Sequence, residues 1–94
     1  MQKASHKVED GKMVKIGVDI NNEEVEGVEI RGDFFLEPPE KLGEIEEKMK
    51  DLDIDSTIEE VAEKVEEVEA ELIGFSHRDI GEAFRKAVEE GDEK

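Results

Sequence analysis

The first half of the chain alternates between apolar and polar residues. From residue 13 to residue 20 every second residue is apolar, namely Val14, Ile16, Val18 and Ile20. This is the period-2 pattern of a strand with one buried face. Residues 25–30, "VEGVEI", predict a second strand with a candidate bulge at Gly27. The segment "NNEE" between them is typical of a turn, so we expect the two strands to form a hairpin.

A third short strand is predicted at residues 34–37, "FFLE", which follow a turn at Gly32-Asp33. Asp10-Gly11 predicts the turn that leads into the first strand. The two prolines at 38 and 39 end the third strand, because proline has no N–H to donate to a strand ladder. We therefore expect a three-stranded antiparallel meander.

After the prolines the apolar spacing becomes helical. The stripe that predicts a helix over residues 39–50 consists of Leu42, Ile45, Met49 and Leu52. Ser56 as N-cap with Glu59 three residues later predicts the start of a second helix by the capping-box pattern. The apolar stripe of that helix is Ile58, Val61, Ala62, Val65 and Val68. The next segment, "AELIGF" at 70–75, is interpreted as a helix end and a packed connection.

A final helix is predicted by Ser76 and Asp79, which repeat the capping pattern. Its apolar stripe is Ile80, Phe84, Ala87 and Val88. Gly91 is a plausible residue just past its end. Strands followed by helices predict an α+β fold, with three helices packed on one face of the meander. We expect residues 1–94 to form a single domain in which 1–5 and 91–94 are loose.

Composition narrows the possible partners. The chain has 29 acidic and 13 basic residues and a net charge of −16. Such a chain repels phosphate backbones and anionic lipids, so nucleic acid and membrane surfaces are poor partners, and a basic protein surface is a better one. Val, Ile, Leu and Phe make up 25 of the 94 residues. That share exceeds the roughly 20% below which disorder is expected, so we predict a folded domain of modest stability.

The cellular location that we expect rests on three features that the sequence lacks. The N-terminal "MQKASHKVEDGK" has no apolar signal stretch, and no apolar run is long enough to cross a membrane. There is no cysteine, which excludes disulfides and thiolate metal sites. We expect a cytoplasmic protein.

Candidate chemistry is sparse. Asp51, Asp53 and Asp55 match the first ligand positions of a calcium loop, but Ser56 and Ala62 stand where glycine and the bidentate glutamate are needed. The segment is better interpreted as a polar linker that ends in a helix cap. The tripeptide Arg-Gly-Asp at 31–33 is interpreted as a turn. We predict no catalytic residue, no cofactor-binding residue and no metal ligand in this chain.

Neither a zinc site nor a phosphate loop is indicated by the sequence. His6 and His77 lie far apart in sequence and lack the i+4 partner typical of zinc ligands. No Gly-rich phosphate loop occurs in the sequence. From the residues alone, the chain is a small acidic α+β interaction module.

Phe34 and Phe35 leave two interpretations open. Neighbours in a regular strand point to opposite faces, so the two rings cannot both enter one core unless a bulge lies at the turn. Either both rings belong to the core, or one is exposed and anchors a partner.

Three segments of the chain resemble the C-terminal accessory domain of lipoate–protein ligases. They are "HKVEDGKMVKIGVDI" from His6, "VEGVEIRGDFFLEPPEKLGEIEEKM" from Val25, and "ELIGFSHRDIGEAFRKAV" from Glu71. Together they cover about residues 6–90, and "GDFF" in this setting is the most specific part. In some members of this family the domain is fused to a catalytic domain, and in others, notably in archaea, it is a separate small subunit. The length of 94 residues leads us to expect the separate subunit.

The resemblance implies an indirect role. In such two-part ligases the catalytic subunit binds lipoate, ATP and Mg, forms lipoyl-adenylate and transfers the lipoyl group to a lysine of a lipoyl acceptor domain. The accessory domain is needed for activation but supplies no nucleophile or nucleotide loop. The family fold is similar to sulfur-acceptor proteins that use a cysteine, and this chain has none, so that chemistry does not carry over.

The resemblance also suggests where the partner would dock. The expected interface with the catalytic subunit is Arg31, Asp33, Phe34 and Phe35. The residues expected near the mouth of the partner's active site are His6, Lys7 and Lys12.

Two other functions stay open. One is an adaptor that binds some other basic protein without any enzyme. The other is a lipoyl acceptor, which requires a lysine at the tip of a tight hairpin in an all-β sandwich. The helical second half of the sequence argues against the acceptor.

Overall fold

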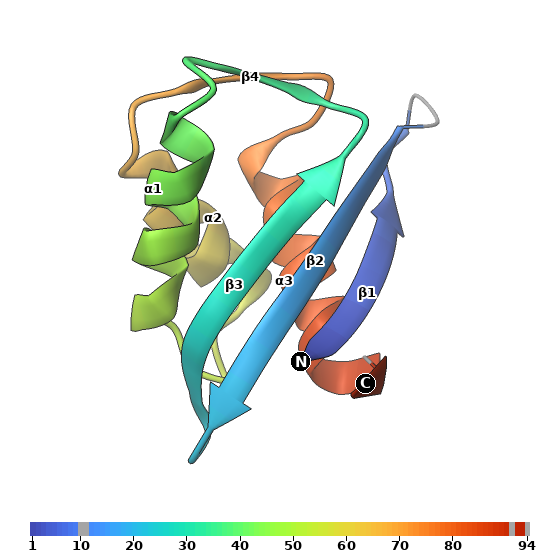
Figure 1. The fold of residues 1–94 in the computed structure, drawn as a ribbon, viewed down its shortest axis with the longest axis vertical. Helices are drawn as coiled ribbons and strands as arrows, with labels where there is room; N and C mark the ends of the chain where they lie inside the picture. Colours follow the sequence, from blue (N-terminus) through green and yellow to red (C-terminus); the bar gives the residue numbers. More distant parts are fainter. Residues whose placement is uncertain (10–11, 91, 94) are drawn as a thin grey trace.

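The chain forms an α+β fold in which a four-stranded sheet carries its helices on one face (Figure 1). The computed structural model describes residues 1–9, 12–90 and 92–93. The elements in chain order are β1 Gln2–Lys7, β2 Met13–Asn21, β3 Glu24–Gly32, β4 Phe35–Glu37, α1 Lys41–Lys48, the 3-10 turn η1 Met49–Asp51, α2 Ile58–Glu66, β5 Glu71–Ile73, α3 His77–Glu90 and β6 Asp92–Glu93.

The main sheet has the strand order β3-β2-β1-β6, with every neighbouring pair antiparallel. Strands β1, β2 and β3 form a meander, and α3 packs across β1 and β2 while α1 lies beside β3. A second sheet contains only β4 and β5 and lies across the end of the molecule where β3 finishes (Figure 1). The predicted fold class, a three-stranded antiparallel meander followed by three helices, is confirmed.

The β2–β3 hairpin follows the predicted pattern. Its two turn residues, Asn22 and Glu23, have φ of 54° and 68°, the left-handed conformation that two-residue hairpin turns require. Asp19 pairs with Gly27 while Ile20 pairs with Val25, so one extra residue lies in β3 next to Gly27. The bulge expected at that glycine is therefore present.

The core lies between the sheet and the helices. Its largest fully buried side chains are Phe84, Ile16, Ile30, Ile45, Met49, Ile80, Val14, Val18, Val61 and Val65. They come from both strands of the hairpin and from all three helices. The apolar stripes that predicted the elements therefore meet one another in a single cluster.

Three predicted elements differ from the structure. The segment "FFLE" is not a strand of the meander, because Phe35–Glu37 pairs with β5. The third strand of the meander is instead β1, which includes residues 2–5 that were expected to be loose. Residues 71–73 form β5 rather than a helix end.

The sequence did not predict strand β1, because the helix that covers its inner face lies at the other end of the chain. Only alternate residues of β1 are partly covered, and α3 covers them from the other end of the chain. Lys86 of α3 also donates a hydrogen bond to the Ser5 carbonyl, 2.9 Å away. The predicted turn at Asp10-Gly11, the residue Gly91 and the end of the 91–94 tail at Lys94 lie outside the described residues, whereas Asp92–Glu93 pairs with Gln2 and Lys3.

Of the two predicted helix N-caps, one is displaced by one residue in the structure and the other is correct. The N-cap of α2 is Thr57, which forms a capping box with Glu60, rather than Ser56 with Glu59. Ser56 instead accepts a hydrogen bond from the Asp53 backbone N–H at 3.1 Å and closes the linker turn. At α3 the predicted pair is correct: Asp79 accepts from the Ser76 N–H at 2.8 Å and Ser76 Oγ accepts from the Asp79 N–H at 3.2 Å.

Candidate functional site

The two phenylalanines of "GDFF" have different environments. Phe34 is partly buried and its ring stacks on Phe75, with ring centroids 4.1 Å apart and 29° between the planes. Phe35 is 69% exposed. Because β4 alternates, the next residue, Leu36, turns inward and is buried. The interpretation in which one ring is exposed is therefore the correct one.

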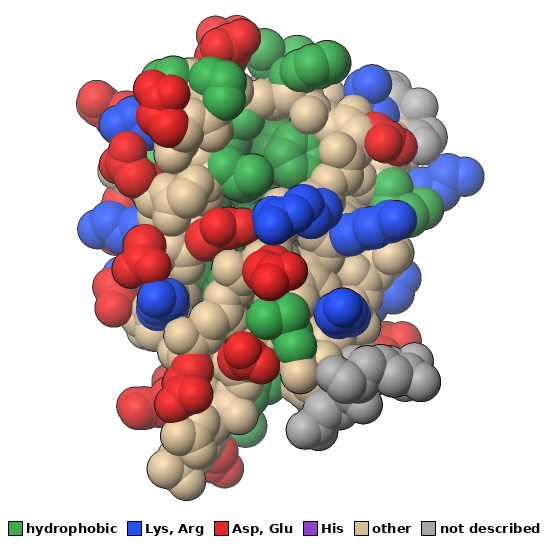
Figure 2. Space-filling view, in the orientation of Figure 1, with side chains coloured by type: hydrophobic (Ala, Val, Ile, Leu, Met, Phe, Trp, Pro, Cys, Tyr) green, Lys and Arg blue, Asp and Glu red, His purple; other side chains and the backbone are tan. Residues whose placement is uncertain are grey.

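Phe35 has an apolar neighbour on the surface. It pairs across the small sheet with Ile73, which is 42% exposed. These two are the exposed large hydrophobic residues among those that the structure describes. Figure 2 shows apolar side chains along the edge of the molecule where β4 runs. We call this pair the apolar anchor, since an exposed aromatic residue beside an aliphatic one is typical of an interface centre.

Arg31 lies near the end of β3, and Asp33 lies in the link between β3 and the apolar anchor. Both are exposed. The guanidinium of Arg31 lies 3.6 Å from the Glu46 carboxylate, and its own strand is tied to α1 because the Ile30 N–H donates to Glu46 at 2.8 Å. The Asp33 N–H donates to the Met13 carbonyl at 3.2 Å, which leaves the carboxylate of Asp33 at the surface. Their role at an interface stays a prediction.

His6, Lys7 and Lys12 do not form one group. His6 faces α3, and its Nε2 lies 3.1 Å from Asp79 Oδ1. Lys7 is the next residue in β1 and is exposed, so it lies on the opposite face of the strand. The stem of Lys12 runs beside Gly74, in the link between β5 and α3. The structure therefore separates His6 from the two lysines.

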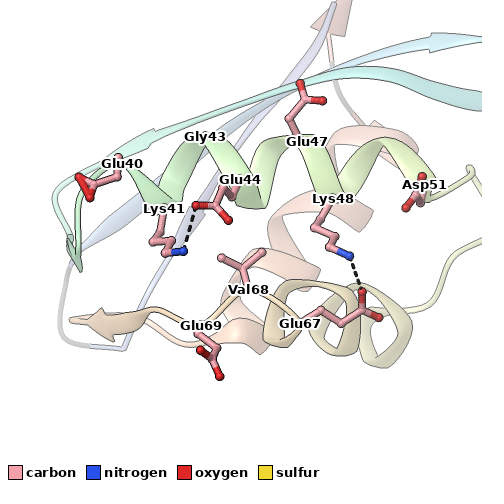
Figure 3. Close-up of a pocket in the computed structure, with 10 residues that line it drawn as sticks. All are labelled: Glu40, Lys41, Gly43, Glu44, Glu47, Lys48, Asp51, Glu67, Val68 and Glu69. Carbon is pink, nitrogen blue, oxygen red and sulfur yellow. Dashed lines mark hydrogen bonds and ion pairs between the residues drawn. The ribbon is translucent and has the colours of Figure 1, made fainter.

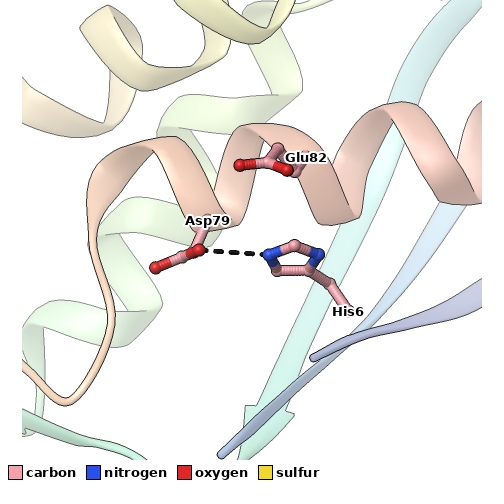
Figure 4. A group of neighbouring side chains, drawn as sticks. All are labelled: His6, Asp79 and Glu82. Carbon is pink, nitrogen blue, oxygen red and sulfur yellow. Dashed lines mark hydrogen bonds and ion pairs between the residues drawn. The ribbon is translucent and has the colours of Figure 1, made fainter. Parts of the chain in front are cut away.

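His6 is part of a cluster that sequence spacing does not reveal (Figure 4). His6 comes from β1, and Asp79 and Glu82 come from the first two turns of α3. Their donor atoms all lie within 4.8 Å of one another, which makes them a geometric candidate for a divalent cation. His6 and Asp79 lie 73 residues apart in sequence, so no local motif predicted their contact.

The members of this cluster already have protein partners. Asp79 accepts from Ser76 through its second oxygen, and Glu82 lies 3.7 Å from the Arg78 guanidinium. Burial raises the pKa of Asp79, but the hydrogen bonds from His6 and Ser76 outweigh burial, so the pKa lies below its ordinary value. Through these contacts the cluster connects β1 to the start of α3, and we call it the strut between β1 and α3.

A groove between α1 and α2 is strongly acidic (Figure 3). Its volume is about 810 Å³, and its charged lining residues are Glu40, Lys41, Glu44, Glu47, Lys48, Asp51, Glu67 and Glu69. Both lysines are engaged: Lys41 lies 3.0 Å from Glu44, and Lys48 lies 3.0 Å from Glu67. The hydrogen bond and charge of Glu67 raise the pKa of Lys48, and the hydrogen bond of Lys48 and the charge of Lys64 lower the pKa of Glu67. Such a groove repels anions.

The structure does not test the predictions that the chain has no catalytic residue and no cofactor-binding residue, so these stay predictions.

Among the described residues, no helix is both long enough and apolar enough to cross a membrane. Comparison with models of known families and with curated proteins gives no match.

Comparison with solved structures gives a match over nearly the whole chain. It covers 90% of this chain and 98% of the other chain, with a TM-score of 0.70 and 17% sequence identity. The other chain belongs to a structure described as an archaeal lipoylation system, a bi-partite lipoate protein ligase and its E2 lipoyl domain from Thermoplasma acidophilum. The chain described here therefore has the same fold as a chain of that archaeal lipoylation system.

Proposed function

We propose that this chain is the accessory subunit of a two-part lipoate–protein ligase. The observation that carries the proposal is the likeness to a chain of a bi-partite ligase system over nearly the full length of both chains. The resemblance of the three sequence segments around "GDFF" points to the same family independently of the fold.

The alternative component in that system is an E2 lipoyl domain. A lipoyl acceptor requires a lysine at the tip of a tight hairpin in an all-β sandwich. Here the tip of the β2–β3 hairpin is Asn22-Glu23, and three helices pack on the sheet. These features favour the ligase component over the acceptor.

The role that we propose is non-catalytic. The chain would bind the catalytic subunit as a heterodimer in the cytoplasm, and the partner would bind ATP, Mg and lipoate. The apolar anchor of Phe35 and Ile73 is the contact that we propose, with Arg31 and Asp33 beside it. Phe34 supports the anchor from behind by stacking on Phe75 rather than by touching the partner.

Docking would act through a conformational equilibrium of the partner. A ligand shifts a protein between two states only if it binds one state more tightly. We propose that this chain binds the state of the catalytic subunit that forms lipoyl-adenylate. Lys7, which is exposed, and Lys12, which is half-buried, are then the cations that would lie near the active-site mouth, whereas His6 is held by Asp79.

An adaptor role is the second candidate, and the acidic groove between α1 and α2 favours it. The groove suits a basic protein segment, because six of its lining residues are carboxylates. The acidic groove could bind such a basic segment whether or not the partner is an enzyme.

The test is lipoyl-adenylate formation from lipoate and ATP by the cognate catalytic ligase, with and without this chain. We expect adenylate to form at a substantial rate only when the chain is present. A catalytic ligase that neither binds the chain nor changes its rate would contradict the accessory role and favour the adaptor.

A further inference from the structure

The open face of the β1–β2–β3 sheet carries cations in an otherwise acidic protein. Lys3 and Lys7 of β1, Lys15 of β2 and Arg31 of β3 are all exposed residues of these strands. They occupy the positions that alternate with the residues turned toward the helices. Figure 2 shows Lys and Arg side chains gathered across the middle of this face, with acidic side chains toward α1 and toward the β2–β3 turn. We call these four residues the basic face.

The lysines of the basic face differ in their partners from four of the lysines that follow β4. Within the described part of the chain, Lys3, Lys7 and Lys15 have no carboxylate within 4.0 Å. The lysines that do have one are Lys41, Lys48, Lys50 and Lys64. Lys12 and Lys86 also lack such a carboxylate, and Lys86 donates to the Ser5 carbonyl instead. Among the described lysines, three of the five without a carboxylate partner therefore lie on one face of one sheet.

The register places like charges against each other. Lys15 pairs directly with Arg31 across β2 and β3, and such pairs are unfavourable by a few tenths of a kcal/mol or more. On its other side Lys15 faces Ser5, and Lys3 faces Gly17. The small residues leave a shallow depression of about 460 Å³ between the cations, with Glu29 as its acidic lining residue. The Lys15–Arg31 repulsion does not favour folding, and an anion outside the chain would offset it.

The dimensions favour a protein surface over a small anion. Lys3 and Lys7 are four residues apart on one strand, about 13 Å at roughly 3.3 Å per residue, and β1 and β3 lie about 10 Å apart. The cations are long flexible side chains on a flat sheet, with no glycine-rich loop or helix N-terminus to clamp a single phosphate. Carboxylates spread over a protein surface match this spacing.

We infer that the basic face docks against an acidic surface of the catalytic ligase subunit, an inference that rests on the proposed function. Continuity with the apolar anchor supports one shared partner. Arg31 lies four residues before Phe35, and the link between them is held to β2 by the Asp33–Met13 hydrogen bond. One partner surface can therefore cover both. Electrostatic complementarity of this kind orients the encounter and makes binding depend on salt.

The experiment compares two double variants of equal net charge. Lys3→Glu with Lys15→Glu reverses the basic face, and Lys50→Glu with Arg78→Glu reverses exposed cations of η1 and α3 as the control. Binding to the cognate catalytic ligase is measured by calorimetry at several salt concentrations, after circular dichroism has shown that both variants fold. We expect the first variant to bind at least tenfold more weakly at low salt and to lose most of its salt dependence. The control should bind within about twofold of the unmodified chain.

The other outcomes are distinct from one another. Equal weakening in both variants would show an effect of net charge alone and would overturn the inference. Unchanged binding in the first variant would overturn the inference and leave the accessory role intact. If the unmodified chain does not bind the ligase, the proposed function fails as well. Binding of the lipoyl acceptor domain that only the first variant loses would assign the basic face to the acceptor and overturn our choice of partner.

Discussion

The helix-covered face and the open face of the β1–β2–β3 sheet are built from alternating residues of the same strands. On the covered face Val14, Val18 and Ile30 have no exposed surface. On the open face Lys15 faces Arg31 across the strands. One face removes apolar area from water and stabilises the fold, while the other places two like charges opposite each other. Residues one position apart are therefore divided between the core and the surface that we propose for docking.

The small β4–β5 sheet shows the same division with one informative difference. Leu36 turns inward and is buried, but its outward neighbour Phe35 is apolar as well. Because its ring is mostly exposed, Phe35 gains little from folding. The comparison thus separates residues whose loss should unfold the protein from residues whose loss should affect only a partner.

The largest expected effect is at the covered face. Phe84→Ala should lower the free energy of unfolding by about 3–5 kcal/mol, because Phe84 is fully buried between α3 and the sheet. Phe84→Leu, with a smaller volume loss, keeps the measurement possible if the alanine variant does not fold. Urea unfolding followed by circular dichroism gives the values.

The matched control on the open face is Lys15→Ala. It should leave the free energy of unfolding within about 0.5 kcal/mol, with a slight gain because it relieves the repulsion with Arg31. A loss as large as that of Phe84→Leu would mean that the open face also stabilises the fold.

A middle-sized effect separates the two phenylalanines. Phe34→Ala should lower the free energy of unfolding by about 1–3 kcal/mol, because it removes the stack on Phe75. Phe35→Ala should change it by less than about 0.5 kcal/mol but weaken binding to the catalytic ligase about tenfold. Thermal unfolding and calorimetric titration measure the two quantities. If both variants melt equally early and bind normally, the apolar anchor is not an interface.

The smallest effect is at the strut between β1 and α3. Asp79→Asn should lower the free energy of unfolding by about 1 kcal/mol at neutral pH, since it weakens the cap and the contact with His6. The pKa of Asp79 is lowered in the folded state, so its charge stabilises the fold fully above the unfolded value of about 3.9. That stabilisation is lost as the pH falls through the lower folded-state pKa.

The contribution of this strut is measured by urea unfolding at a series of pH values, from neutral pH down to the lowest pH at which the protein stays folded. The difference between the unmodified chain and Asp79→Asn should shrink only in the acid range. As a control, Asp33→Asn, at an exposed carboxylate, should change the free energy of unfolding by less than about 0.5 kcal/mol at neutral pH. A difference for Asp79→Asn that does not vary with pH would mean that the charge of Asp79 contributes nothing.

The sequence by itself determined the features that depend on nearby residues. The period-2 pattern of 13–20, the Asn22-Glu23 turn and the Ser76–Asp79 cap are each specified within a few positions of the chain. Local periodicity and turn chemistry are sufficient for these, so the α+β class could be predicted. The division between Phe34 and Phe35 is different, because the sequence left two interpretations open and only the structure shows that Phe35 is the exposed ring.

Only the tertiary structure decided which segments pair. Strand β1 depends on α3 at the other end of the chain, and β4 pairs with β5, whose sequence also fits a connection. The contact between His6 and Asp79, the acidic groove and the basic face all join residues that are distant in sequence. Such contacts depend on which of several short strands finds a partner in the folded chain, and no local pattern carries that information.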